Sequence, residues 1–156
     1  MTPTIRVLAC GAIDRGDDGA AVRAVRSLTK HARQGATIEE VGYLSPELLI
    51  GDTPGLPRLV LDCVVGLPGG EIIDLPLAEL PALEARLGAT STHALAPGAA
   101  VAIASLLGGV RPDDRFLGIG GISFEMGDPL SPAVRVRLGA LVERMVTRIA
   151  EARPCA

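Results

Sequence analysis

The chain has 156 residues, a formal net charge of -3 at pH 7 and a hydrophobic fraction of 48%. This length suits one ordinary domain with a real core and is too short for two, so we expect a single domain over residues 1–156. The chain has no Trp and no run of Lys or Arg. Because phosphate binding needs clustered basic groups and base stacking needs aromatic rings, we expect no nucleic-acid partner.

The sequence also indicates the cellular compartment that we expect for the protein. Its first residues, MTPTIRVLACG, lack the positive region and the long apolar stretch of a signal peptide. The longest uncharged run, residues 94–110, is shorter than the about 20 apolar residues that span a bilayer, and we interpret it as a buried helix. Cys10, Cys63 and Cys155 form no paired framework, and free thiols fit a reducing compartment. We expect a cytoplasmic monomer without membrane contact.

Apolar runs alternate with helical patterns along the whole chain. The runs predict strands at 5–9, 36–41, 58–64, 71–75 and 116–122. The intervening patterns predict helices at 21–32, after Ser45-Pro46, within 75–88, over 94–110 and after Ser131-Pro132, with frayed residues beyond Ala152. This order predicts an α/β fold: a three-layer, mostly parallel twisted sheet of about five strands with helices on both faces.

Candidate functional residues fall where the predicted strands end or a helix begins. Asp17 and Asp18 lie in the loop GAIDRGDDG after the first strand, Asp62 lies near the end of strand 58–64, and His93 precedes the helix of residues 94–110. Ligands of such sheets bind beyond the carboxyl ends of the strands. Each residue also has a structural alternative, because Asp caps helices and loops and a junction histidine can be structural. His31, near the end of the first predicted helix, needs no functional explanation.

Two carboxylates and an imidazole suit a divalent first-row metal in an open site, with a position left for water or substrate. The loop before the first predicted helix lacks the Gly-Lys-Ser/Thr ending of a P-loop and the Gly-x-Gly-x-x-Gly spacing of a dinucleotide fold, and adjacent carboxylates would repel phosphate. Cys63 has no evident base partner, so we interpret it as a small buried hydrophobe rather than a nucleophile.

Five segments, taken in order, resemble one known family. They are DRGDDGAAV, GYLSPELL, VLDCVVGLPGGEI, STHALAP and FLGIGGISFEMGDPLSP. Together they cover much of the chain and are similar to the hydrogenase maturation endopeptidases. The resemblance implies a hydrolase, a protease that removes the carboxyl-terminal tail of the nickel-loaded large-subunit precursor of a nickel–iron hydrogenase, with that precursor as its partner.

The resemblance also assigns roles to residues. It implies that Asp18, Asp62 and His93 are both the metal ligands and the catalytic residues of an aspartyl, metal-binding protease. The metal it implies is nickel, delivered by the substrate, with another divalent metal as a substitute in vitro. Asp17 is then a supporting or helix-capping residue. The family usually has Asn where this chain has Ala12, which leaves the geometry of that loop open.

Other functions stay open at this point. One is a non-hydrolytic, flavodoxin-like module that binds a small ligand. Another is a non-cleaving checkpoint protein that only inspects the large subunit, which the departure at Ala12 favours. Within the enzyme hypothesis, water activation by the metal and by an aspartate acting as general base are both compatible with the sequence.

Overall fold

A computed structural model of the chain describes residues 2–51, 55–88 and 95–155. Within them, five strands form one sheet in the order β2-β1-β3-β5-β4. The strands are β1 (Ile5–Cys10), β2 (Ala36–Gly42), β3 (Arg58–Val64), β4 (Ile72–Pro76) and β5 (Arg115–Gly120). All neighbouring pairs are parallel except β4 with β5. The predicted mostly parallel α/β sheet is confirmed.

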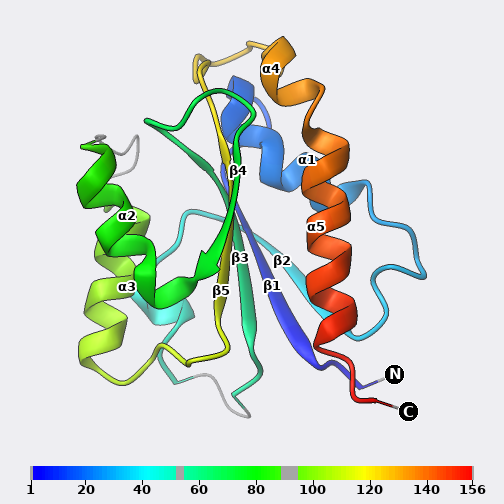
Figure 1. Cartoon of the computed structure of the whole chain (residues 1–156), viewed down its shortest axis with the longest axis vertical. Helices are drawn as coiled ribbons and strands as arrows, with labels where there is room; N and C mark the ends of the chain where they lie inside the picture. The colour runs from blue at the N-terminus through cyan, green and yellow to red at the C-terminus, as the bar shows by residue number, and fades with distance from the viewer. Residues whose placement is uncertain (1, 52–54, 89–94, 156) are drawn as a thin grey trace.

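Helices cover both faces of this sheet (Figure 1). One layer contains α1 (Ala20–Arg26) and α5 (Leu138–Glu151), and the opposite layer contains α2 (Leu80–Leu87) and α3 (Pro97–Leu106). The short elements are the 3₁₀ turns η1 (Gly16–Gly19), η2 (Pro46–Leu48) and η3 (Leu77–Glu79), and the helix α4 (Pro132–Arg135). Every residue of β3 is buried, as expected for a central strand with both faces covered.

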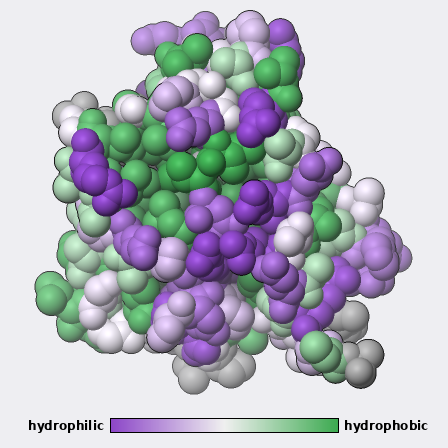
Figure 2. Space-filling view, viewed as in Figure 1, coloured by the Kyte–Doolittle hydropathy of each residue, from purple (hydrophilic) through white to green (hydrophobic). Residues whose placement is uncertain are grey.

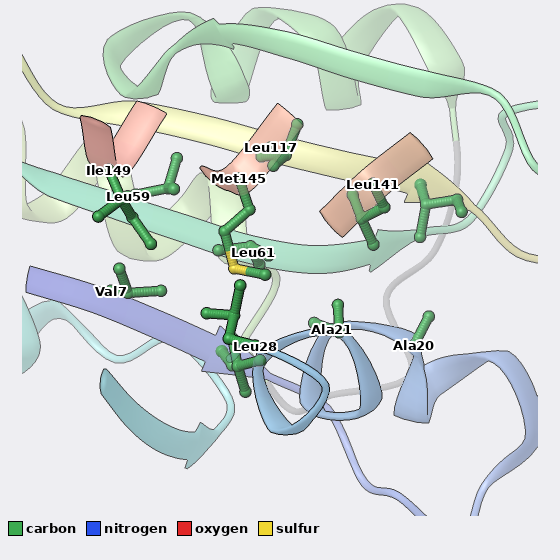
Figure 3. Close-up of a cluster of buried hydrophobic side chains, with 14 of the residues drawn as sticks. Val7, Ala20, Ala21, Leu28, Leu59, Leu61, Leu117, Leu141, Met145 and Ile149 are labelled. Carbon is green, nitrogen blue, oxygen red and sulfur yellow. The ribbon is translucent and has the colours of Figure 1, made fainter. Parts of the chain in front are cut away.

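Alternation along the strands divides the core into two clusters. Leu59 and Leu61 of β3 pack with the α1 and α5 layer, whereas Val60 and Val64 pack with the α2 and α3 layer. Figure 3 shows the first cluster, in which Met145 extends from α5 toward the sheet and α1. Leu141, Met145 and Ile149 recur every four residues and so share one buried face of α5.

Two helix boundaries differ from the sequence prediction. The first helix ends at Arg26, so His31 lies in the turns that follow it. Arg33 ends the helix by donating to the carbonyl oxygens of Leu28 and Val25, which replaces further helical turns. At the last helix Ser131 is the predicted cap, with its Oγ accepting from the Val134 N–H. That helix is divided into α4 and α5.

The helix predicted to be buried, α3, is buried on one face only. Ala100, Val101 and Ala104 of α3 contact the core, but Leu106 is 88% exposed. The pattern of small residues indicated burial, whereas α3 lies in an outer layer that has only one partner face. Residues beyond Ala152 were predicted to be frayed, but Arg153 donates a hydrogen bond to the carbonyl oxygen of Gln34.

Strand β4 forms an edge of the sheet, and charge protects it. Asp74 on this strand accepts from Arg115 and Arg148 and forms a longer ion pair with Arg144. Figure 2 shows hydrophobic side chains gathered over the upper part of β4 and hydrophilic ones below them. A charged group fixed on an edge strand discourages pairing with another strand.

No helix among the described residues is long and apolar enough to cross a membrane.

A buried ion pair joins the amino end of β3 to its neighbours. Arg58, 2% exposed, donates to both carboxylate oxygens of Asp114, which is fully buried. The same guanidinium donates to the carbonyl oxygens of Leu49 and Gly109. The pair therefore connects β3, the residue that follows η2 and the segment before β5 in one network of hydrogen bonds.

We expect Asp114→Ala to destabilise the protein by about 3–5 kcal/mol, because Arg58 would be left charged, buried and unpaired. Urea unfolding followed by circular dichroism measures this change. The double variant Arg58→Met/Asp114→Ala should be more stable than Asp114→Ala alone. Equal stability of Asp114→Ala and the wild type would contradict the structural role given to this pair.

Candidate active site

The candidate residues lie where β1 and β3 approach their carboxyl ends. Asp18 lies in η1, after a sharp turn that Gly11 makes at the end of β1. Gly11 has a φ of 107°, and a Cβ there would collide with the backbone carbonyl of Asp18. Asp62 lies two residues before the end of β3 and is buried, with 4% exposure, as is Asp18.

Asp17 is the hydrogen-bonding centre of this region. It is fully buried, and its Oδ2 accepts from the N–H groups of Ile122 and Ser123 at 2.9 and 3.0 Å. Ser131 contributes two more bonds, from its N–H to Oδ1 at 2.7 Å and from its hydroxyl to Oδ2 at 2.8 Å. These donors belong to the segment between β5 and α4, not to the helix that Asp17 precedes.

The electrostatics of Asp17 follow from these bonds. Burial raises the pKa of a carboxyl, but the donors from Ile122, Ser131 and Ser123 outweigh it, so the pKa of Asp17 lies below its ordinary value. Further backbone bonds join the same segments, including Asp17 N–H to the Ser123 carbonyl and Gly127 N–H to the Asp14 carbonyl. Asp17 is thus an ionised carboxylate that joins the loop after β1 to the segment between β5 and α4.

Asp18 is held differently. Its Oδ2 accepts from the backbone N–H of Ala12 at 2.8 Å. This bond uses the main-chain N–H, which both Asn and Ala provide at position 12. The departure at Ala12 therefore leaves this contact of Asp18 in place.

Asp62 is an acid in an unfavourable environment. Burial first, and then the negative charge of Asp18, raise the pKa of Asp62 to about 8. The backbone N–H of Cys63, which donates to its Oδ1 at 2.8 Å, opposes this shift only in part. Asp18 and Asp62 are therefore close enough to interact, and without a cation the pair retains a proton near neutral pH.

Two buried thiols adjoin the acidic pair. Burial, followed by the charges of Asp62 and Asp18, raises the pKa of Cys10 well above its ordinary value. Burial and the same charges, together with that of Asp17, also raise the pKa of Cys63. A thiol that stays protonated is a poor nucleophile, which supports the interpretation of Cys63 as a small buried hydrophobe.

The sequence analysis did not identify Glu84, on α2, as part of this region. By strand alternation Asp62 lies on the sheet face that α2 and α3 cover, and the charge of Glu84 contributes to the raised pKa of Asp62. Burial raises the pKa of Glu84 itself. In sequence Glu84 is one polar residue of a short amphipathic helix, so only the packing of that helix reveals its place.

The structure thus brings Asp18 and Asp62 together, and Asp17 bonds to the segment between β5 and α4. His93 lies outside the described residues, so its position relative to the pair stays a prediction. Among the described residues, no group of three or more His, Cys, Asp and Glu side chains is arranged to hold a metal ion. Two buried carboxylates with unfavourable mutual charge can accept a cation or transfer a proton, and both abilities serve hydrolysis.

Asp62 gives a pH prediction for the metal-free protein. Its folded pKa of about 8 exceeds the unfolded value of 3.8, so its contribution to stability is full below about pH 4 and is lost as the pH rises toward 8. We expect Asp62→Asn to remove this loss and to gain stability over the wild type between pH 5 and pH 8.5. Urea unfolding with a chelator present measures both proteins. An unchanged stability difference across this range would contradict a raised pKa.

Several solved structures have a fold similar to that of this chain. The nickel–iron hydrogenase maturation protease HybD from Thermococcus kodakarensis is 24% identical, with a TM-score of 0.64 and coverage of 92% of this chain and 96% of that one. The hydrogenase maturating endopeptidase HybD from E. coli is 23% identical, with a TM-score of 0.73 and coverage of 97% and 94%. The protease HycI from Thermococcus kodakarensis KOD1 is 20% identical, with a TM-score of 0.64 and coverage of 94% and 92%.

No family model matches the chain, and no curated protein matches it. The three structural likenesses extend over nearly the full length of each chain, at low sequence identity. What they establish is the architecture: this chain has the fold of the hydrogenase maturation proteases.

Proposed function

We propose that this protein is a maturation endopeptidase that removes the carboxyl-terminal tail from the nickel-loaded large-subunit precursor of a nickel–iron hydrogenase. The observation that carries the proposal is the buried pair Asp18 and Asp62, on a fold shared with proteases of that name. The sequence resemblance across five segments supports it independently of the fold.

The chemistry of the pair fits a divalent cation. Asp62 accepts a hydrogen bond from the backbone N–H of Cys63, but its negative form is disfavoured by burial and by Asp18. A cation at this position would relieve that repulsion and favour the ionised form of Asp62. Under this proposal His93 is the third ligand. The nickel belongs to the substrate. Binding of these residues to it would therefore also indicate that the large subunit already contains nickel.

In the cleavage step, a water adds to the scissile peptide bond. Its hydroxyl goes to the carbonyl carbon, the C–N bond breaks, and the remaining proton goes to the amine of the released tail. Nickel held in the substrate would supply a Lewis acid that polarises the carbonyl. Asp62, ionised by the cation, would be the general base that takes a proton from water.

Asp17 has a supporting role in this proposal. Its bonds to Ile122, Ser123 and Ser131 fix the loop that carries Asp18 against the segment after β5. A residue committed to four donors in the protein has little capacity left for a ligand. Asp18 and Asp62 therefore carry the chemistry, and Asp17 holds the loop.

Cleavage of the precursor tests the proposal. Incubation of purified protein with nickel-loaded precursor from the same genome should shorten the precursor by its carboxyl-terminal tail, as intact-mass spectrometry measures. We expect Asp18→Asn and Asp62→Asn each to lower the rate by at least about 100-fold, because each removes a charge that acts on the reacting centre.

Two controls accompany this assay. Asp14→Asn changes an exposed carboxylate in the same loop, and we expect it to cleave at the wild-type rate. Precursor without nickel should stay intact if the metal reports readiness. A wild-type protein that leaves the loaded precursor intact, or an Asp62→Asn variant that cleaves it at full rate, would overturn the proposal.

A further inference from the structure

The segment between β5 and α4 carries apolar side chains that the proposed cleavage chemistry does not use. Ile122 is 63% exposed and Met126 is 67% exposed, whereas the apolar side chains of the five strands are buried or half-buried. Figure 1 shows this segment at the end of the sheet where β1 and β3 have their carboxyl ends. Exposed apolar surface at one place on a protein is typical of a site of interaction.

Hydrogen bonds hold this segment against the loop that carries the first acid of the pair. The N–H of Ile122 donates to the Asp17 carboxylate at 2.9 Å. The N–H of Gly127, next to Met126, donates to the carbonyl oxygen of Asp14 at 2.7 Å. A surface whose backbone is already fixed loses little conformational entropy when a partner binds to it.

An aromatic ring supports the same segment. Phe124 lies between the two exposed residues in sequence and is half-buried. A Cβ at Gly121 would lie 2.8 Å from Cζ of Phe124 and 3.0 Å from Cβ of Asp17, so the ring and the aspartate both lie against the Gly121 backbone. The segment therefore presents its exposed apolar side chains from a packed base.

Acidic groups accompany the exposed apolar side chains. Asp14, Glu125 and Asp128 are exposed, and Arg15 is the only basic residue in the sequence of the loop after β1 and of the segment between β5 and α4. A second copy of this chain, placed across a two-fold axis, would bring these acids against their own copies. Like charges that face each other disfavour association. The surface therefore fits a partner whose apolar side chains are accompanied by basic groups.

We propose that Ile122 and Met126 form a docking surface for the large-subunit precursor, which contacts them through apolar side chains accompanied by basic groups. The inference rests on the proposed function for the identity of the partner and adds the place where that partner is held. A polypeptide whose scissile bond lies at Asp18 and Asp62 also lies beside a segment that is hydrogen-bonded to the loop of Asp18. Ile122 and Met126 contact no reacting atom.

Binding of nickel-free precursor measures docking without cleavage. Ile122→Thr and Met126→Gln each introduce a polar group, and neither removes a backbone N–H. We expect each change to raise the Kd about tenfold, and the double variant about 100-fold, as biolayer interferometry measures. Leu106→Gln changes an exposed leucine at the end of α3 and is the matched control, which should bind as the wild type does. Circular dichroism checks that each variant is folded.

Cleavage of nickel-loaded precursor gives a second readout. The variants at Ile122 and Met126 should raise KM by similar factors with little change in kcat, because a surface that contacts substrate and transition state alike contributes uniform binding. A double variant with the Kd and KM of the wild type would overturn the proposal. So would a fall in kcat at unchanged KM, which indicates a role in the reaction itself.

The remaining outcomes separate this proposal from the proposed function and from another occupant. If the wild type binds the precursor, leaves its nickel-loaded form intact and loses binding in the double variant, the proposed function fails and the docking surface stands. A wild type that binds neither form of the precursor contradicts both. Sedimentation velocity tests for a second copy of this chain: a wild-type dimer that the double variant loses would assign the surface to self-association and overturn the proposal.

Discussion

The geometry of the candidate site depends on one buried carboxylate, that of Asp17. Its four hydrogen bonds join the loop after β1 to the segment between β5 and α4, two parts of the chain more than 100 residues apart. Gly121 belongs to the same junction, because a Cβ there would contact Cys63 and lie 3.0 Å from the Asp17 Cβ. With the loop fixed in this way, Asp18 remains beside Asp62.

Asp17 and Asp62 therefore have opposite environments. Donors surround Asp17 and lower its pKa, whereas Asp62, beside Asp18, has its pKa raised by burial and by that neighbour's charge. The contrast separates an ionised, structural carboxylate from one that can hold a proton near neutral pH. The resulting site carries unfavourable charge, and a cation relieves it. Glu84 extends the acidic region to α2.

Much of this architecture could be predicted from the sequence, and the reasons are local. The run RLVLDCV predicted β3 with the boundaries that the structure has, because a strand covered on both faces needs continuous apolar residues. The end of α1 could not be predicted, since Arg33 caps it from the following turns. Asp18 and Asp62 stood out as acids at element ends. The bonds of Asp17 and the approach of Glu84 depend on long-range packing, which periodicity does not encode.

Asp17 stabilises the fold through its hydrogen bonds, whereas the charge of Asp18 destabilises it by repelling ionised Asp62. Urea unfolding of the metal-free wild type, Asp17→Asn and Asp18→Asn at pH 8.5, above the pKa of Asp62, separates these two effects. Asp17→Asn should lose about 1–3 kcal/mol, because an amide leaves buried N–H donors unsatisfied. Asp18→Asn should gain stability, because it removes a charge beside Asp62. Wild-type stability for Asp17→Asn, or a loss for Asp18→Asn as large as that for Asp17→Asn, would contradict the claim.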